Sequence, residues 1–106
     1  MKKYQLFVGL EDQKEKRQII DTQAALDFIA STLVNAGIEG CTFTTGKGLY
    51  LYKDGSIGYE TSIIAMILDF DGNALQAIHK AVPTIKQCLN QESVALEYQE
   101  VESMLI

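Results

Sequence analysis

The stretch Ser62–Phe70, S-I-I-A-M-I-L-D-F, decides the fold because it is apolar on both sides of a strand. Successive side chains of a strand point to opposite faces. Two sets therefore alternate along it: Ile63, Ala65 and Ile67 on one side, and Ile64, Met66, Leu68 and Phe70 on the other. A strand with one wet face would alternate apolar with polar residues, so both faces of this strand need cover.

The composition is that of a folded, acidic protein of one domain, residues 1–106. Hydrophobic residues make up 47% of the chain and charged residues 22%, which is unlike a disordered protein. No run approaches the roughly 18 apolar residues of a membrane span. Glu11 and Asp12 interrupt the apolar start before a signal-type core develops. We therefore expect a cytoplasmic location.

The charges and cysteines exclude several classes of partner. A formal net charge of −5 opposes binding to nucleic acid. Cys41 and Cys88 are far apart and lie in no C-x-x-C pair, which predicts buried free thiols rather than a metal site. Gly46-Lys47-Gly48 is only a fragment of a phosphate loop, and a strand follows it. No cofactor, metal, nucleic-acid or membrane partner is expected.

The periodicities predict four strands and two helices. Strands are expected at Tyr4–Leu10, Cys41–Tyr52, Tyr59–Phe70 and Ser93–Gln99, and helices from Asp21 or Thr22 to Ala36 and from Asn73 to about Leu89. Lys53–Ser56 is a turn signal that joins the second and third strands in a hairpin. The segment from Glu11 to Arg17 interleaves both charges and is predicted to be a mobile loop.

Several single residues carry local predictions. Gly37 should cap the first helix in the left-handed conformation. Asn73 and Gln76 suit a capping box at the start of the second helix. Pro83 lies within an apolar stripe that keeps its phase, so a kink is expected rather than two helices. Gly46 and Gly48 predict a bulge or bend in the second strand.

The element order β-α-β-β-α-β is that of the ferredoxin-like sandwich, an α+β fold. Right-handed crossovers give the antiparallel sheet the order 4-1-3-2 and place both helices on one face. The strands that are apolar on both faces are the two that this order places in the centre. The second face of the sheet then has no cover within the chain.

A second copy of the chain is the expected cover, so we predict a homodimer, with higher oligomers left open. Either set of the third strand, Ile63, Ala65 and Ile67 or Ile64, Met66 and Leu68, could lie at the interface. The first set is taken as the interface, together with the apolar tail Met104, Leu105 and Ile106.

Four short motifs in a fixed order resemble a family of small, uncharacterised bacterial proteins. They are F-x-G-L at Phe7–Leu10, a glycine-aromatic-D-G hairpin at Gly48, Tyr50, Asp54 and Gly55, E-x-S at Glu60 and Ser62, and Q-E-S-V at Gln91–Val94. The chain has Tyr50 where that family usually has tryptophan, and it lacks the export signal of many members. The resemblance implies the fold and no activity.

The predicted topology brings several polar residues to one end of the sheet, beside the start of the first helix. They are Glu60, Ser62, Gln91, Ser93 and Tyr52. They could hold a small anionic or polar ligand near the unpaired N–H groups of the helix. They could equally satisfy the backbone of turns and strand starts, as short polar side chains often do.

Three functions remain open at this point. The leading hypothesis is a non-enzymatic homo-oligomeric domain that binds or senses a small molecule or a protein. The second is an interaction or inhibitor protein whose acidic surface meets a basic partner. The third is a small dimeric α+β barrel enzyme, with a pocket lined by Glu60, Ser62 or Tyr98. No catalytic residue is assigned.

Overall fold

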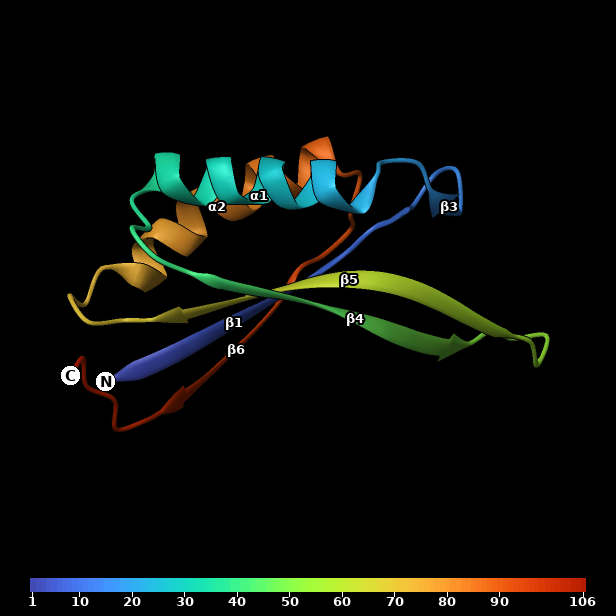
Figure 1. Cartoon of the computed structure of the whole chain (residues 1–106). Coiled ribbons are helices and arrows are strands. Elements are labelled where there is room, and N and C mark those ends of the chain that lie inside the picture. Colours follow the sequence, from blue (N-terminus) through green and yellow to red (C-terminus); the bar gives the residue numbers. More distant parts are fainter.

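Four long strands form one antiparallel sheet, and both helices lie on one face of it (Figure 1). The computed structural model describes residues 1–106. Its elements are β1 (Lys2–Gly9), β2 (Glu11–Asp12), β3 (Arg17–Gln18), α1 (Thr22–Ala36), β4 (Thr42–Leu51), β5 (Ile57–Leu68), α2 (Ala74–Cys88) and β6 (Ala95–Glu100). The sheet order is β4-β5-β1-β6. When the four long strands are numbered 1 to 4 along the chain, this order becomes 2-3-1-4. Read from the other edge of the sheet, it is the predicted order 4-1-3-2.

The central strand β5 divides its apolar side chains between the core and an uncovered face. Ile63, Ala65 and Ile67 are at most 2% exposed and pack in the core beneath the helices. The prediction that these three form an interface is therefore wrong, because the chain's own helices cover them. Ile64, Met66 and Leu68 are partly exposed on the opposite face.

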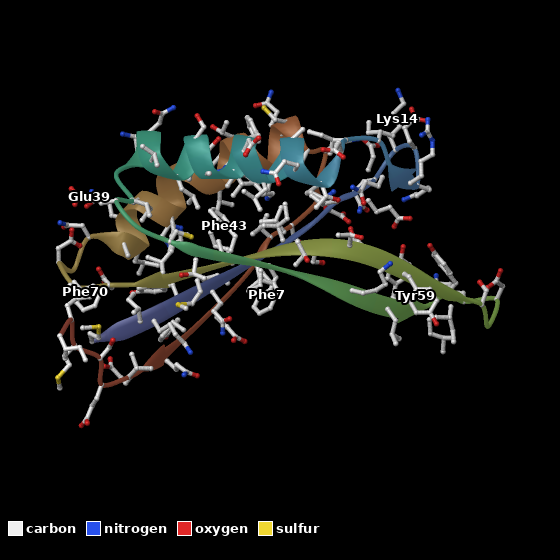
Figure 2. The ribbon with its side chains drawn as sticks, viewed as in Figure 1. Phe7, Lys14, Glu39, Phe43, Tyr59 and Phe70 are labelled. Carbon is white, nitrogen blue, oxygen red and sulfur yellow. The ribbon has the colours of Figure 1, made fainter.

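That uncovered surface, formed by Phe7, Ile64, Met66 and Leu68, is called the open face below. In Figure 2, Phe7 lies on the side of the sheet away from the helices, whereas Phe43 points towards them. Phe43 packs against the core cluster and Phe7 does not.

Helix α1 begins and ends at the residues that the sequence predicts. The Asp21 carboxylate accepts hydrogen bonds from the N–H groups of Gln23 and Ala24, 3.1 and 3.2 Å away. Gly37 closes the helix with φ 117°, a conformation that favours glycine. These local signals confirm the predicted helix.

Helix α2 begins differently from the prediction. The Asn73 side chain makes no capping hydrogen bond. Asp69, which follows β5, instead accepts from the N–H groups of Gly72 and Ala74. The predicted capping box is wrong, since Asp69, directly after β5, takes its place. The helix continues through Pro83 as one element, as expected.

Strands β4 and β5 continue past the helices as a two-stranded projection, here called the arm (residues 48–60; Figure 1). Pairing runs without interruption from Thr42 opposite Met66 to Leu51 opposite Ile57, so the predicted glycine bulge is wrong. The arm lengthens the molecule to 49 × 25 × 21 Å. Four of its apolar side chains are each more than half exposed: Leu49, Leu51, Ile57 and Tyr59.

The segment predicted to be a mobile loop folds into a short ribbon made of β2 and β3. Asp12 organises it, although this carboxylate is only 6% exposed. Its Oδ1 accepts from the N–H groups of Lys14 and Glu15 and from the side-chain amide of Asn90. The ribbon is thereby tied to the chain that follows α2.

Two further predictions concern exposed residues. Both cysteines are free thiols, but Cys88 is exposed on α2, so its predicted burial is wrong. The tail residues Met104, Leu105 and Ile106 are at least 78% exposed, and nothing in the chain covers them. Neither helix has the length and apolar character needed to cross a membrane.

Candidate functional site

Glu60 lies on the sheet face opposite the helices, at the point where β1 ends. Its Oε1 accepts a hydrogen bond from the N–H of Glu11 at 2.9 Å. The carboxylate occupies the space above Gly9, and a Cβ at Gly9 would overlap it. A glycine at the end of β1 therefore makes room for this carboxylate.

Two tyrosines of β4 and the turn extend the cluster from the arm. The Tyr52 hydroxyl donates to the Tyr50 hydroxyl at 2.9 Å, and the Tyr50 hydroxyl donates to Glu11 Oε2. The two rings meet edge to face, with centroids 4.9 Å apart. A Cβ at Gly58 would approach both rings within 2.7 Å, so this glycine makes room for them.

The hydrogen bond to Glu11 raises the pKa of Tyr50, and the bond from Tyr52 acts in the same direction. An anionic phenol beside a carboxylate would be repelled, so Tyr50 remains a neutral donor. We refer to Glu11, Tyr50 and Glu60 as the carboxylate cluster. Glu11 Oε1 and Glu60 Oε2 accept no hydrogen bond within the chain, so each is available to a ligand.

Of the five residues predicted for the site, Glu60 lies in the carboxylate cluster and Tyr52 donates a hydrogen bond to its Tyr50. Gln91 donates to the backbone carbonyls of Glu11 and Leu89, at 2.6 and 3.2 Å, and so positions the cluster's backbone. Ser62 pairs with Gly9 on the same sheet face, and Ser93 is exposed; neither side chain makes a hydrogen bond.

Sequence reasoning missed Glu11 as a site residue and weighed Tyr50 only as an aromatic. The charged neighbours of Glu11 predict a mobile loop instead. Two glycines could have indicated the site, Gly9 at the end of β1 and Gly58 within β5, because glycine in a strand often marks a place where another group approaches the backbone closely. Tyr98 lies away from the cluster and contacts Tyr4.

The electrostatics favour a ligand with a positive or hydrogen-bond-donating group. The Glu60 carboxylate accepts from the backbone of Glu11, and the Glu11 carboxylate accepts from Tyr50, so both acidic side chains belong to one hydrogen-bonded cluster. At the start of α1 the predicted anion would compete with the Asp21 carboxylate, which already accepts from the N–H groups of Gln23 and Ala24. No three His, Cys, Asp or Glu side chains gather in a way that could hold a metal ion.

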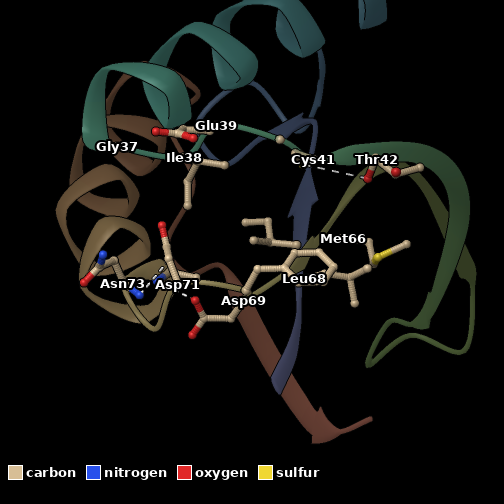
Figure 3. A pocket seen from close by; sticks show the side chains of 14 residues that line it. Gly37, Ile38, Glu39, Cys41, Thr42, Met66, Leu68, Asp69, Asp71 and Asn73 are labelled. Carbon is tan, nitrogen blue, oxygen red and sulfur yellow. Dashed lines mark hydrogen bonds between the residues drawn. The ribbon is translucent and has the colours of Figure 1, made fainter. Parts of the chain in front are cut away.

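A cavity of about 360 Å³, here called the second cavity because it is a site apart from the carboxylate cluster, lies at the other end of the molecule (Figure 3). The α1–β4 and β5–α2 connections form its walls, with Ile38, Met66 and Leu68 among its apolar lining. Asp69 on its rim is already used by the start of α2. Burial raises the pKa of the Cys41 thiol to about 11, so this thiol is protonated and poorly nucleophilic.

Solved structures with the same fold include a phage SAM lyase and the protein CutA1. The lyase in complex with S-methyl-5'-thioadenosine is 25% identical, covering 93% of this chain and 80% of its own, with a TM-score of 0.68. The apo lyase is 20% identical, covering 92% of this chain and 78% of its own, with a TM-score of 0.72.

CutA1 from Pyrococcus horikoshii is 12% identical, covering 99% of this chain and 87% of its own, with a TM-score of 0.62. No curated protein sequence matches the chain. Residues 3–104 match a protein family of unknown function, which fits the resemblance drawn from the sequence motifs. The chain therefore belongs to the DUF3574 family.

Proposed function

We propose that this protein is a homo-oligomer that binds a small S-adenosyl compound at the carboxylate cluster. The observation that carries the proposal is the convergence of Glu11, Tyr50 and Glu60 beside the open face, with two carboxylate oxygens unused. A sulfonium ion and an α-ammonium group are both positive, and S-adenosylmethionine carries both. Carboxylates held by hydrogen bonds near an apolar surface suit such a ligand.

Similarity to the phage lyase supports this ligand class. That protein is 25% identical over nearly the whole of this chain, and its structure holds S-methyl-5'-thioadenosine. Similar folds alone would not assign a ligand, since one fold serves many functions. The proposal rests on the combination of that similarity with the local chemistry.

Self-association is supported by two apolar surfaces that the chain leaves uncovered. The open face is one, and the exposed apolar side chains of the arm are the other. Contiguous apolar surface of this kind marks interaction sites in soluble proteins. Because the carboxylate cluster lies on the same sheet face as Ile64 and Met66, a copy packed there would form a further wall of the site.

Calorimetric titration of the purified oligomer with S-adenosylmethionine and S-methyl-5'-thioadenosine tests the proposal. Glu60→Gln should weaken S-adenosylmethionine binding by roughly 10- to 150-fold, because a charge-assisted bond of about 1.5–3 kcal/mol is lost. Glu39→Gln is the matched control, since Glu39 lines the second cavity. A loss with Glu39→Gln alone would place the ligand in that cavity and contradict the proposal, as would wild-type protein that binds neither compound.

Cleavage of S-adenosylmethionine is the second candidate function. The similar phage protein is a SAM lyase, and Glu11 and Glu60 are carboxylates of the kind that act as general bases. Chromatography of an incubation with S-adenosylmethionine would show S-methyl-5'-thioadenosine if the protein is a lyase. Tight binding without product supports the binding function instead.

A further inference from the structure

The arm carries its exposed apolar side chains on one side only. Strands β4 and β5 pair without interruption, so the alternation of faces continues from the sheet into the arm. Phe43 packs against the core, which places the odd-numbered residues of β4 on the helix side. Two cross-strand pairs of the arm lie on that side and are called the apolar stripe below: Leu49 with Tyr59, and Leu51 with Ile57. The arm extends past both helices, so nothing in the chain covers the stripe (Figure 1).

The open face lies on the other side of the same sheet. Ile64 pairs with Thr44 there, out of phase with the apolar stripe. The stripe and the open face therefore point in opposite directions, and neither can cover the other within one chain. A contact of open face with open face would leave both stripes in water. A stripe laid on the open face of a second copy would bury one surface of each kind.

The apolar stripe is the more accessible of the two surfaces. Its four side chains are 56–71% exposed, whereas those of the open face are only partly exposed. A specific interface takes roughly 800 Å² of surface from each partner. Four partly exposed side chains supply only a fraction of that area. A stable assembly therefore needs the arm as well as the open face.

The two surfaces also carry opposite charges at one end. Lys47 is exposed and precedes Leu49 on the helix side of β4. The carboxylate cluster adjoins the open face at Glu60, which precedes Ile64 on the same face of β5. The ion pair of the structure joins the amino terminus to Glu100 and uses neither Lys47 nor Glu60. Complementary charges of this kind steer two surfaces together and fix their register.

We propose that the arm of one copy lies on the open face of another, with the apolar stripe against Ile64 and Met66 and with Lys47 towards the carboxylate cluster of that second copy. The inference rests on the self-association in the proposed function and names the surfaces that meet. Each copy supplies one arm and receives another, so a reciprocal dimer or a closed ring leaves no stripe in water. The received arm forms a wall of the carboxylate cluster that the single chain does not provide.

Two variants, each with one damaged surface, test this arrangement by light scattering. Leu51→Glu places a charge on the apolar stripe, and Ile64→Glu places one on the open face. Water reaches both positions, so circular dichroism should show both variants folded. Ile57→Glu and Met66→Glu, on the same two surfaces, replace a variant that does not fold. Each variant alone should give a mass near 11.8 kDa, because every contact needs both surfaces. Lys53→Glu, in the turn at the tip of the arm, is the matched control and should keep the wild-type mass.

A mixture of the two variants in equal amounts is the decisive measurement. Leu51→Glu keeps an intact open face and Ile64→Glu keeps an intact arm, so the mixture should form one sound contact and give the mass of two chains. A mixture that stays at the mass of one chain would overturn the inference. So would Leu51→Glu with the wild-type mass, because the open faces would then meet without the arm.

These measurements use no ligand, so they separate this inference from the ligand of the proposed function. Protein that assembles through the arm and binds no S-adenosyl compound would contradict only that ligand. Protein that binds S-adenosylmethionine and assembles without the arm would contradict only this inference. Wild type with a mass of 11.8 kDa at every concentration would overturn this inference together with the proposed self-association.

Discussion

At Gly9, the missing side chain leaves the space that the Glu60 carboxylate occupies. Gly9→Ala should displace this carboxylate, because a flexible side-chain end moves more readily than the strand. The lost hydrogen bond costs about 0.5–1.5 kcal/mol. The gain from replacing glycine within a strand is about 0.5–1 kcal/mol. Urea denaturation should therefore show the free energy of unfolding changed by less than about 1 kcal/mol, while affinity for S-adenosylmethionine falls.

Gly40→Ala is the matched control for Gly9→Ala, because a Cβ at Gly40 meets no atom within 4 Å. It should leave both stability and affinity unchanged. Unaltered binding by Gly9→Ala would show that the Glu60 carboxylate has no part in the site. Unfolding of Gly9→Ala would show instead that the position is structural.

Asp12 gives stability a dependence on acid pH. The N–H of Glu15 above all, assisted by Asn90 and Lys14, lowers the pKa of this carboxyl below 3.8, against the effect of burial. The ionised form stabilises the fold fully above that value, and its contribution is lost as pH falls through the lowered pKa. Asp12→Asn should therefore be less stable than wild type at pH 7, with a smaller difference at pH 3.

Urea denaturation at both pH values measures this effect, and Asp27→Asn, on the exposed side of α1, is the control. A difference between wild type and Asp12→Asn that does not change with pH would contradict the lowered pKa.

The site was only partly predictable because its decisive contacts cross between strands. Glu60 could be named because the sequence predicts a strand start beside it, although the structure places it inside β5. The bond from Tyr50 to Glu11 depends on a glycine in each of two strands, and on a ribbon that holds Glu11 near the arm. Asp12 builds that ribbon through Asn90, 78 residues away in sequence. A charged local segment carries no signal of such a distant partner.

Among the elements, α1 was predictable because its signals are local. Asp21 and Gly37 bond to residues within five positions of themselves. The start of α2 was not, since its N–H groups are bound by Asp69, directly after β5, and not by the expected cap Asn73. The faces of β5 were equally ambiguous from sequence, because both of its sets are apolar. The register of β1 against β5 decides which set is buried. Val8 pairs with Ile63 and Leu6 with Ala65, so these apolar pairs share the core face, whereas Met66 pairs with the polar Gln5 on the other face.

Pro83 lies inside α2 without ending it, and its side chain is exposed. Pro83→Ala restores a backbone donor and a residue of high helix propensity. We expect a change in the free energy of unfolding between slightly negative and about +1 kcal/mol. Proline costs about 3 kcal/mol in an unadapted helix, but the neighbours Ala81 and Ile85 already pack in the core with the proline in place. Thermal melting measures it, with Thr84→Ala as the neighbouring control. A loss of several kcal/mol would mean that the packing of α2 requires the proline.

For the whole molecule, the open face predicts the state of assembly. Ile64→Glu should fold and give a mass near 11.8 kDa by light scattering, whereas wild type should give a multiple of it. A charge on the open face opposes a sheet-to-sheet contact, but water can reach it in the single chain. Ile67→Glu should fail to fold, because Ile67 is 2% exposed in the core.

Val34→Glu is the control for this prediction, because Val34 is an exposed apolar residue on α1, away from the open face. Its mass should match that of wild type. Wild-type protein of 11.8 kDa at all concentrations would contradict self-association. A monomer produced by Val34→Glu alone would place the interface on the helices.

The arm also has a dynamic consequence. A two-stranded hairpin such as the arm, without a third strand or a helix against it, is marginally stable by itself. In a separated subunit the arm should open locally many times before the sheet centre does, and its amides should exchange with deuterium fastest. Assembly would suppress this opening, because a partner's surface would cover Leu49 and Ile57. The arm would then be ordered only as the subunits meet, so part of the fold would be completed by association.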